Sequence, residues 1–228
     1  MEINENSIKK LVGFKPKCID LYKIAFVHKS IAKDLGTDSY ERLEFVGDSV
    51  IGLIVASYLY EKYPNENEGY LTRVRTKIVS SKGLSYFAGL LKLGEYVKMN
   101  SKALNQEWNN NPRILEDVFE ALVGALYLDK GLEFCRKFMI RLIEKHMETS
   151  ELETDTNYKD ILMKYVQARQ MKSPVYAVTH TDGPDHAKKY TVQININNRK
   201  VSEGTDKSKK QAEQNSAYLA LKCIGYTF

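Results

Sequence analysis

The sequence predicts an all-α domain followed by a small α+β domain with the order α-β-β-β-α. Three observations support this fold class. Residues 1–147 contain successive apolar stretches with helical spacing. Residues 148–157 are acidic and threonine-rich without an apolar period, which is typical of a flexible linker. In residues 158–228, a helical pattern is followed by strand-like alternation and then by a second helical pattern.

Composition and charge describe a soluble protein with a basic second domain. The chain has 228 residues, of which 43% are hydrophobic and 28% are charged, as in an ordinary globular protein. Its net charge is +5, with +2 on residues 1–150, +6 on residues 156–228 and acidic residues between them. A basic domain of this kind predicts a polyanionic partner.

Targeting and redox features indicate the cytoplasm. We expect no signal peptide, because Met1–Lys10 mixes acidic and basic residues without an apolar core. The most apolar stretch, Val50–Tyr60, is too short to span a bilayer, so we expect no membrane partner. The three cysteines, Cys18, Cys135 and Cys223, have no paired spacing and suit thiols in a reducing compartment.

The first domain is expected to begin with short helices over residues 4–36, followed by a long helix. Asp38 or Ser39 would cap this long helix, with Glu41 completing a capping box. A Tyr-Pro pair would end it after Lys62. The remaining expected elements of this domain are helices over 70–81 and 82–91, a polar loop over 100–112, a helix opened by Pro112 and an amphipathic helix over 131–147.

Carboxylates gather on two of these helices. At 100° per residue, Glu41, Glu44 and Asp48 fall within an arc of about 60° on the long helix. Asp117 and Glu120 are about 60° apart on a second apolar helix. A solvated acidic face is one interpretation. The apolar surroundings favour another, because unpaired buried charge is costly and clustered like charges call for a cation.

The kind of cation follows from the ligands. Oxygen ligands without histidine suit Mg²⁺ or Mn²⁺ rather than zinc. A di-iron bundle would need Glu-x-x-His pairs, which neither acidic helix contains. His28 has no histidine or cysteine nearby at ligand spacing, so we expect it to pack or to form hydrogen bonds.

In the second domain, the expected elements are a helix over 158–169, strands over 175–180, 190–196 and 199–203, and a final helix to about Ile224. Ser208 is positioned to cap that final helix. Lys209 and Lys210 then stand at its N-terminus, where the helix dipole and free backbone N–H groups already favour phosphate.

Two motifs carry a resemblance to a known family. The segment ERLEFVGDSVI, residues 41–51, resembles the signature helix of the ribonuclease III family, and EDVFEALVGALYLDKG, residues 116–131, resembles its second acidic helix. They occur in the family's order and at a similar separation. The resemblance implies a metal-dependent endoribonuclease that cuts double-stranded RNA to 5′-phosphate and 3′-hydroxyl ends with a short 3′ stagger.

The resemblance also assigns roles to the acidic residues. It implies that Mg²⁺, with Mn²⁺ as a substitute, is held by Glu44, Asp48, Asp117 and Glu120. It implies catalytic roles for Asp48 and Glu120 and a supporting one for Glu41. The family's catalytic domain is a homodimer, and Phe45 matches an aromatic residue that reaches toward the partner subunit.

The second domain resembles a double-stranded-RNA-binding domain in three blocks, residues 174–176, 183–186 and 208–213. The RNA contacts that this implies are Gly183, Pro184, His186, Ser208, Lys209 and Lys210. The chain departs from the usual pattern at Tyr40, where many relatives have Asn, at Met163-Lys164, where many have Gln-Glu, and at Asp206, where Gly is usual.

Two classes of function fit these features, a nuclease and a non-cleaving binder of double-stranded RNA. A binder of this ancestry would be expected to lose at least one carboxylate, and all are present, which favours the nuclease. The residues favour no particular natural RNA and do not separate a bacterial host from a viral one.

Overall fold

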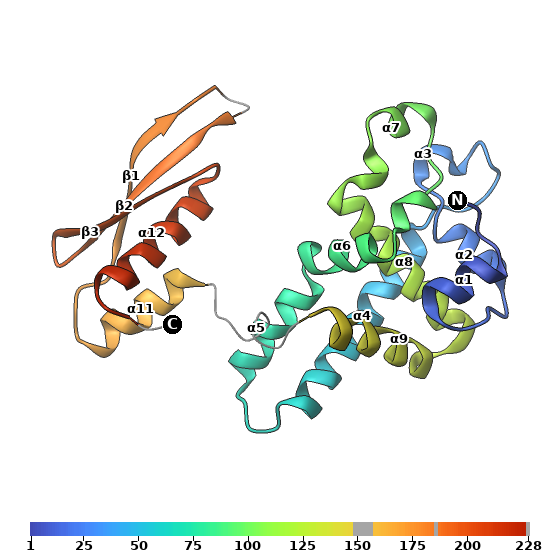
Figure 1. Ribbon diagram of the computed structural model, residues 1–228, viewed down its shortest axis with the longest axis horizontal. Coiled ribbons are helices and arrows are strands. Elements are labelled where there is room, and N and C mark those ends of the chain that lie inside the picture. Colours follow the sequence, from blue (N-terminus) through green and yellow to red (C-terminus); the bar gives the residue numbers. More distant parts are fainter. Residues whose placement is uncertain (148–156, 185–186, 227–228) are drawn as a thin grey trace. The chain divides into compact units, whose positions relative to one another are not determined.

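A computed structural model of the chain describes residues 1–147, 157–184 and 187–226. The chain divides into two compact units, Met1–Glu153 and Thr154–Phe228, which are described separately (Figure 1). The predicted linker, residues 148–157, lies outside the described residues except for Asn157.

The first unit is all-α, as predicted. Its elements are α1 (Glu5–Val12), α2 (Ile19–Ile24), α3 (Lys29–Ala32), α4 (Glu41–Lys62), α5 (Glu68–Val79), α6 (Ser81–Leu90), the 3-10 turn η1 (Leu93–Glu95), α7 (Ser101–Asn105), the 3-10 turn η2 (Trp108–Asn110), α8 (Pro112–Lys130) and α9 (Leu132–His146). The central pair is α4 and α8, with α2, α6 and α9 packed against α8 (Figure 1). Every residue of α8 from Val118 to Leu126 is buried.

The crossing of α4 and α8 depends on two glycines. A Cβ atom at Gly47 would lie 1.8 Å from the carbonyl oxygen of Glu120, and one at Gly124 would lie 2.1 Å from that of Leu43. No side chain fits at such distances, so each helix presents a glycine to the other's backbone. The two helices therefore approach more closely than any pair of side chains would allow.

Side-chain caps begin several of the other helices. Asn67 accepts a hydrogen bond from the backbone of Tyr70 at the start of α5. Asn111 accepts one from Arg113, with Pro112 at the first position of α8, as predicted.

The predicted capping box at the start of α4 is wrong. The helix begins at Glu41 after Tyr40, which makes no side-chain cap. The Ser39 hydroxyl donates instead to the Glu41 carboxylate at 2.9 Å, so these two side chains bond to each other rather than to the helix backbone.

The predicted polar loop over 100–112 is also wrong, because it contains α7 and η2. The side chain of Asn100 accepts a hydrogen bond from the backbone N–H of Ala103 and starts α7. Turns as short as α7 and η2 show no apolar period, which is why the sequence pattern did not reveal them.

By length and composition, α4 is apolar enough to cross a membrane. It is longer than the apolar stretch that the sequence singled out, Val50–Tyr60. Its inner side chains, including Ile51, Val55 and Leu59, are almost completely buried in the core of the first unit. This is the pattern of a central helix in a globular domain.

The second unit has the predicted α-β-β-β-α order. Its elements are α11 (Tyr158–Ala168), β1 (Val175–Asp182), β2 (Lys189–Ile196), β3 (Arg199–Asp206) and α12 (Lys209–Cys223). The strands form an antiparallel sheet in the order β1-β2-β3, and α12 packs on β2 and β3. Gly204 permits this packing, because a Cβ atom there would lie 2.4 Å from the backbone nitrogen of Ser216.

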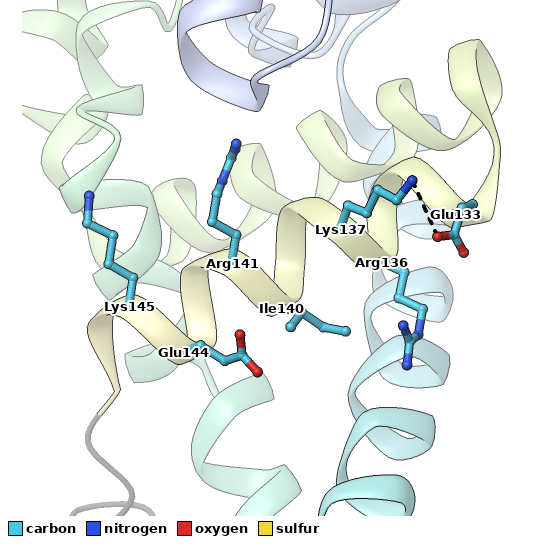
Figure 2. A pocket seen from close by; sticks show the side chains of 7 residues that line it. All are labelled: Glu133, Arg136, Lys137, Ile140, Arg141, Glu144 and Lys145. Carbon is cyan, nitrogen blue, oxygen red and sulfur yellow. Dashed lines mark ion pairs between the residues drawn. The ribbon is translucent and has the colours of Figure 1, made fainter.

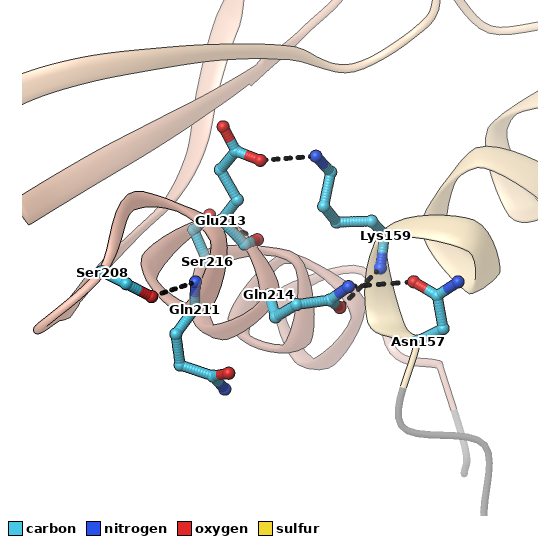
Figure 3. Close-up of polar contacts among 7 residues, drawn as sticks. All are labelled: Asn157, Lys159, Ser208, Gln211, Glu213, Gln214 and Ser216. Atoms are coloured by element: carbon cyan, nitrogen blue, oxygen red, sulfur yellow. Dashed lines mark hydrogen bonds and ion pairs between the residues drawn. The ribbon is translucent and has the colours of Figure 1, made fainter. Parts of the chain in front are cut away.

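Polar contacts join α11 to α12 (Figure 3). Lys159 Nζ pairs with the half-buried Glu213 carboxylate at 2.5 Å, and the Lys159 backbone N–H donates to Gln214 Oε1 at 3.2 Å. Gln214 in turn donates to Asn157 Oδ1 at 2.9 Å. The Ser208 hydroxyl accepts a hydrogen bond from the Gln211 N–H, which confirms Ser208 as the cap of α12.

We predict that Gly47→Ala destabilises the first unit, at the upper end of the roughly 1–3 kcal/mol that overpacking costs. The added methyl group would push α4 away from the α8 backbone. Urea unfolding followed by circular dichroism measures the effect. Gly89→Ala on α6 is the control, because its Cβ atom would meet nothing within 4 Å. Equal stabilities of the two variants would contradict the proposed constraint.

Candidate active site

Three carboxylates meet where α4 crosses α8. Oxygen atoms of Glu44, Asp117 and Glu120 lie within 4.8 Å of one another. Glu44 lies on α4, three residues before Gly47, and Glu120 is the residue whose backbone faces that glycine. The glycine contact that sets the helix separation therefore also sets the separation of these acids.

Asp48 and Glu41 take different positions around this cluster. Asp48 is exposed one turn after Glu44, and, after desolvation, its charge is the next cause of the raised pKa of Glu120. Glu41 is bound instead by Lys29 at 3.1 Å and by Ser39 at 2.9 Å. The hydrogen bond from Lys29, followed by that from Ser39, lowers the pKa of Glu41. Glu41 is thus paired with the ammonium group of Lys29, whereas Glu44, Asp117 and Glu120 lie close to one another.

Burial and mutual repulsion raise the pKa values within the cluster. Glu120, only 8% exposed, has its pKa raised to about 8, first by desolvation and then by the charges of Asp48 and Glu116. Desolvation and the charge of Asp117 raise the pKa of Glu44 to about 7. Desolvation also raises the pKa of Asp117. The folded chain therefore holds these groups in surroundings that disfavour their charged forms.

Two further residues belong to this region and were missed from the sequence. Glu116 raises the pKa values of Glu44, Asp117 and Glu120 by its charge. Its spacing of four residues from Glu120, which places both on one helix face, was a usable signal. Tyr40 donates a hydrogen bond from its hydroxyl to Asp117 Oδ2 at 3.3 Å. No sequence spacing connects residues so far apart in the chain.

The cluster fits a divalent cation. Among the residues that the structure describes, the group is made of carboxylate oxygens alone, which hard cations such as Mg²⁺ prefer. A bound cation would offset both the repulsion and the desolvation that raise the pKa values. His28 is not part of this site: it is buried, and its Nδ1 accepts a hydrogen bond from the Ser30 N–H, as expected for a packing histidine.

The predicted RNA contacts lie at two places on the second unit. Ser208, Lys209 and Lys210 are exposed at the N-terminus of α12. Gly183, after β1, has φ +89°, and a Cβ atom there would lie 2.7 Å from the Ala187 carbonyl oxygen, so the turn requires glycine. Pro184 is exposed beside it, and His186 lies outside the described residues.

The unusual residues of this unit are accommodated locally. Asp206 Oδ1 accepts a hydrogen bond from the Lys207 backbone at 2.6 Å, and its Oδ2 accepts one from the Asn215 side chain at 3.0 Å. Its carboxylate is therefore held at the end of β3 by neighbouring donors. Met163 packs against the core of the unit, which explains an apolar residue at that position.

A shallow groove of about 570 Å³ runs along α9, and none of the acidic cluster lines it (Figure 2). Three of its four basic side chains have partners. Arg136 pairs with Glu61 at 2.5 Å, Lys137 with Glu133 at 3.6 Å, and Arg141 bonds to the carbonyl of Val12. The groove is thus separate from the acidic cluster.

Comparison with known proteins identifies the family. A Ribonuclease-III-like model matches residues 19–147, and a double-stranded RNA binding motif matches residues 158–223. Ribonuclease 3 of Chlorobium luteolum is 38% identical over 222 residues, covering 95% of this chain and 80% of its own. The chain belongs to the ribonuclease III family. It is a ribonuclease III-type endoribonuclease with one nuclease domain and one RNA-binding domain.

Other similar proteins match the chain over most of its length. Ribonuclease 3 of Leptospira interrogans is 37% identical over 92% of this chain and 86% of its own, and a putative protein of Paramecium bursaria Chlorella virus 1 is 42% identical over 97% and 79%. The crystal structure of the ribonuclease III nuclease domain from Campylobacter jejuni is 34% identical, with a TM-score of 0.60, and covers 65% of this chain and 99% of its own. The all-α fold of the first domain is that of a ribonuclease III nuclease domain.

We predict that Glu120→Gln stabilises the metal-free protein at pH 8 but not at pH 5. Glu120 has a folded pKa of about 8 against an ordinary value of 4.5, so its favourable protonated form is lost as the pH rises through 8. Glutamine does not titrate. The advantage of the variant should therefore grow between pH 5 and pH 8 to a few kcal/mol, at about 1.4 kcal/mol per pKa unit.

Urea unfolding in EDTA at both pH values measures this difference. Glu133→Gln, on the exposed face of α9, is the control and should show no such growth. If the difference in unfolding free energy between wild type and Glu120→Gln is the same at both pH values, the folded structure does not raise the pKa of Glu120.

Proposed function

We propose that this protein cuts double-stranded RNA in a divalent-metal-dependent hydrolysis that leaves 5′-phosphate and 3′-hydroxyl ends with a short 3′ stagger. The observation that carries this proposal is the meeting of Glu44, Asp117 and Glu120, with Asp48 beside them, at the glycine crossing of α4 and α8. Mg²⁺ is the proposed cation, and Mn²⁺ should substitute because it shares a preference for oxygen ligands.

Within this site, Glu44, Asp48, Asp117 and Glu120 would hold the cation, with Asp48 and Glu120 as the catalytic pair. The chemistry that a bound cation would supply there is activation of water and neutralisation of charge on the scissile phosphate. Glu120 contributes its buried carboxylate, whose raised pKa makes its charged form depend on a nearby positive charge. Glu41 supports the site by holding Lys29 beside the cluster.

The RNA-binding domain would supply affinity for the duplex. Lys209 and Lys210 are exposed at the N-terminus of α12, where backbone N–H groups and the helix dipole favour phosphate. Gly183 and Pro184 are exposed and would contact a minor groove, where 2′-hydroxyls distinguish RNA from DNA. The shared apolar core of α11 and α12, with the pairing of Lys159 and Glu213 beside it, positions the helix that bears the two lysines.

We also propose a cytoplasmic homodimer formed through the nuclease domain. Phe45 and Leu53 on α4 are 77% and 55% exposed, an unusual setting for large apolar side chains on a central helix. A second structure of the Campylobacter jejuni nuclease domain is described by flexibility in its region involved in dimer formation. Sedimentation of the full chain tests the assembly.

The free thiols of Cys18, Cys135 and Cys223 support a reducing compartment.

We predict that Glu120→Gln lowers cleavage of a long RNA duplex in Mg²⁺ by orders of magnitude while duplex binding in EDTA stays near wild type. The reason is that Glu120 would contact the cation and not the RNA. Gel-based cleavage with end-group analysis and a mobility-shift assay measure the two effects. Glu133→Gln is the control and should retain both. Parallel loss of binding and cleavage would contradict the assignment, and a wild type that binds without cutting would show a binder.

We predict that Lys209→Ala and Lys210→Ala each reduce the salt slope of duplex binding by about 1, because each removes one phosphate contact. Binding titrations from low to physiological salt measure the slope. Lys222→Ala, near the other end of α12, is the control, since its ammonium lies over the Tyr218 ring. If the slopes of all three variants equal that of wild type, the N-terminal lysines are only solvated charges.

A further inference from the structure

Tyr40 connects the start of α4 to the acidic cluster on α8. Its side chain is almost completely buried, with 3% of its surface exposed, and its hydroxyl donates to Asp117 Oδ2 at 3.3 Å. As Tyr40 precedes α4 without capping it by its side chain, helix initiation does not account for this hydroxyl. The contact instead reaches one of the proposed cation ligands.

The ring of Tyr40 has little freedom to move. Its backbone N–H donates to the Val27 carbonyl at 2.9 Å, and its own carbonyl accepts hydrogen bonds from the first turn of α4. The ring lies against that of His28, with centroids 5.8 Å apart, and His28 in turn meets the edge of Trp108. The hydroxyl is therefore presented to Asp117 from a fixed position.

We propose that Tyr40 is a positioning residue, whose hydroxyl fixes the orientation of the Asp117 carboxylate for cation binding; this rests on the cation site of the proposed function. A carboxylate on a single-bonded stem can rotate, and a buried donor restricts that rotation before the cation arrives. Partners of this kind, which bond to a metal ligand rather than to the metal, commonly change affinity by about 10–100-fold.

The geometry separates this role from that of packing. Tyr40→Phe keeps the buried ring and its contact with His28 and removes only the hydroxyl. The chain also offers a matched bond elsewhere: Tyr22, fully buried, donates to Asp129 Oδ2 at 3.0 Å. Asp129 also accepts the backbone N–H groups of Lys17 and Cys18, so that pair holds the start of α2 and lies outside the acidic cluster.

The test is direct binding of Mn²⁺, followed by electron paramagnetic resonance of the free ion, to wild type, Tyr40→Phe and Tyr22→Phe. Tyr40→Phe should weaken Mn²⁺ binding by about 10-fold or more. Tyr22→Phe should bind as wild type does, even if it is less stable in urea. In cleavage assays, Tyr40→Phe should need more Mg²⁺ but approach the wild-type kcat at saturation, with KM for RNA unchanged.

The outcomes separate the two proposals. Wild-type Mn²⁺ affinity in a folded Tyr40→Phe would overturn the positioning role and leave the cation site intact. Equal weakening in Tyr40→Phe and Tyr22→Phe would show a general loss of stability and would also overturn it. A wild type that binds no Mn²⁺, or a Glu120→Gln variant that binds it equally well, would remove the cation site and this inference with it.

Discussion

The backbone-to-backbone approach of α4 and α8 is the constraint on which the active site depends. Gly47 and Gly124 each face a carbonyl of the other helix at a distance that leaves no room for a side chain. Helices packed through side chains would lie 8–10 Å apart and would spread their acids accordingly. Because Glu44 lies one turn before Gly47 while Glu120 lies opposite it, the close contact brings carboxylates of two separate helices into one cluster. The geometry of the proposed cation site thus depends on two glycines that have no functional side chain of their own.

This arrangement places an electrostatic cost inside the nuclease domain. Burial and neighbouring charges raise the pKa values of Glu44 and Glu120 to about 7 and 8, so near neutral pH the cation-free site is under strain. Burial of the apolar side chains along the central turns of α8 offsets this unfavourable electrostatic free energy. A bound cation would offset this repulsion and desolvation, so the same electrostatics would favour cation binding at the proposed site. Stability and function are therefore coupled at this crossing. A neutral side chain in place of Glu120 should raise the stability of the protein and lower its activity.

Much of the fold and part of the site could be predicted from local sequence pattern. Apolar periodicity revealed the long helices, and the β-alternation revealed the second domain, because both patterns repeat over many residues. Caps and short turns did not follow: α7 rests on the side chain of Asn100, and the Asp38 or Ser39 cap was displaced by a bond between Ser39 and Glu41. The acids on each helix were visible from spacing. The bond from Tyr40 to Asp117 joins residues 77 positions apart, so only the tertiary structure brings it to light.

The division of charge between the two domains follows from the chemistry of the site. Carboxylates gathered at one point repel an RNA backbone over roughly the Debye length, about 8 Å at physiological salt, unless a cation lies between them. A site built this way contributes little attraction of its own to a polyanion, and residues 1–150 carry a net charge of only +2. Residues 156–228 carry +6, with lysines at a helix N-terminus. Attraction to phosphate is thereby concentrated in a domain separate from the acidic cluster. The carboxylates of the first domain and the lysines of the second therefore do not neutralise each other.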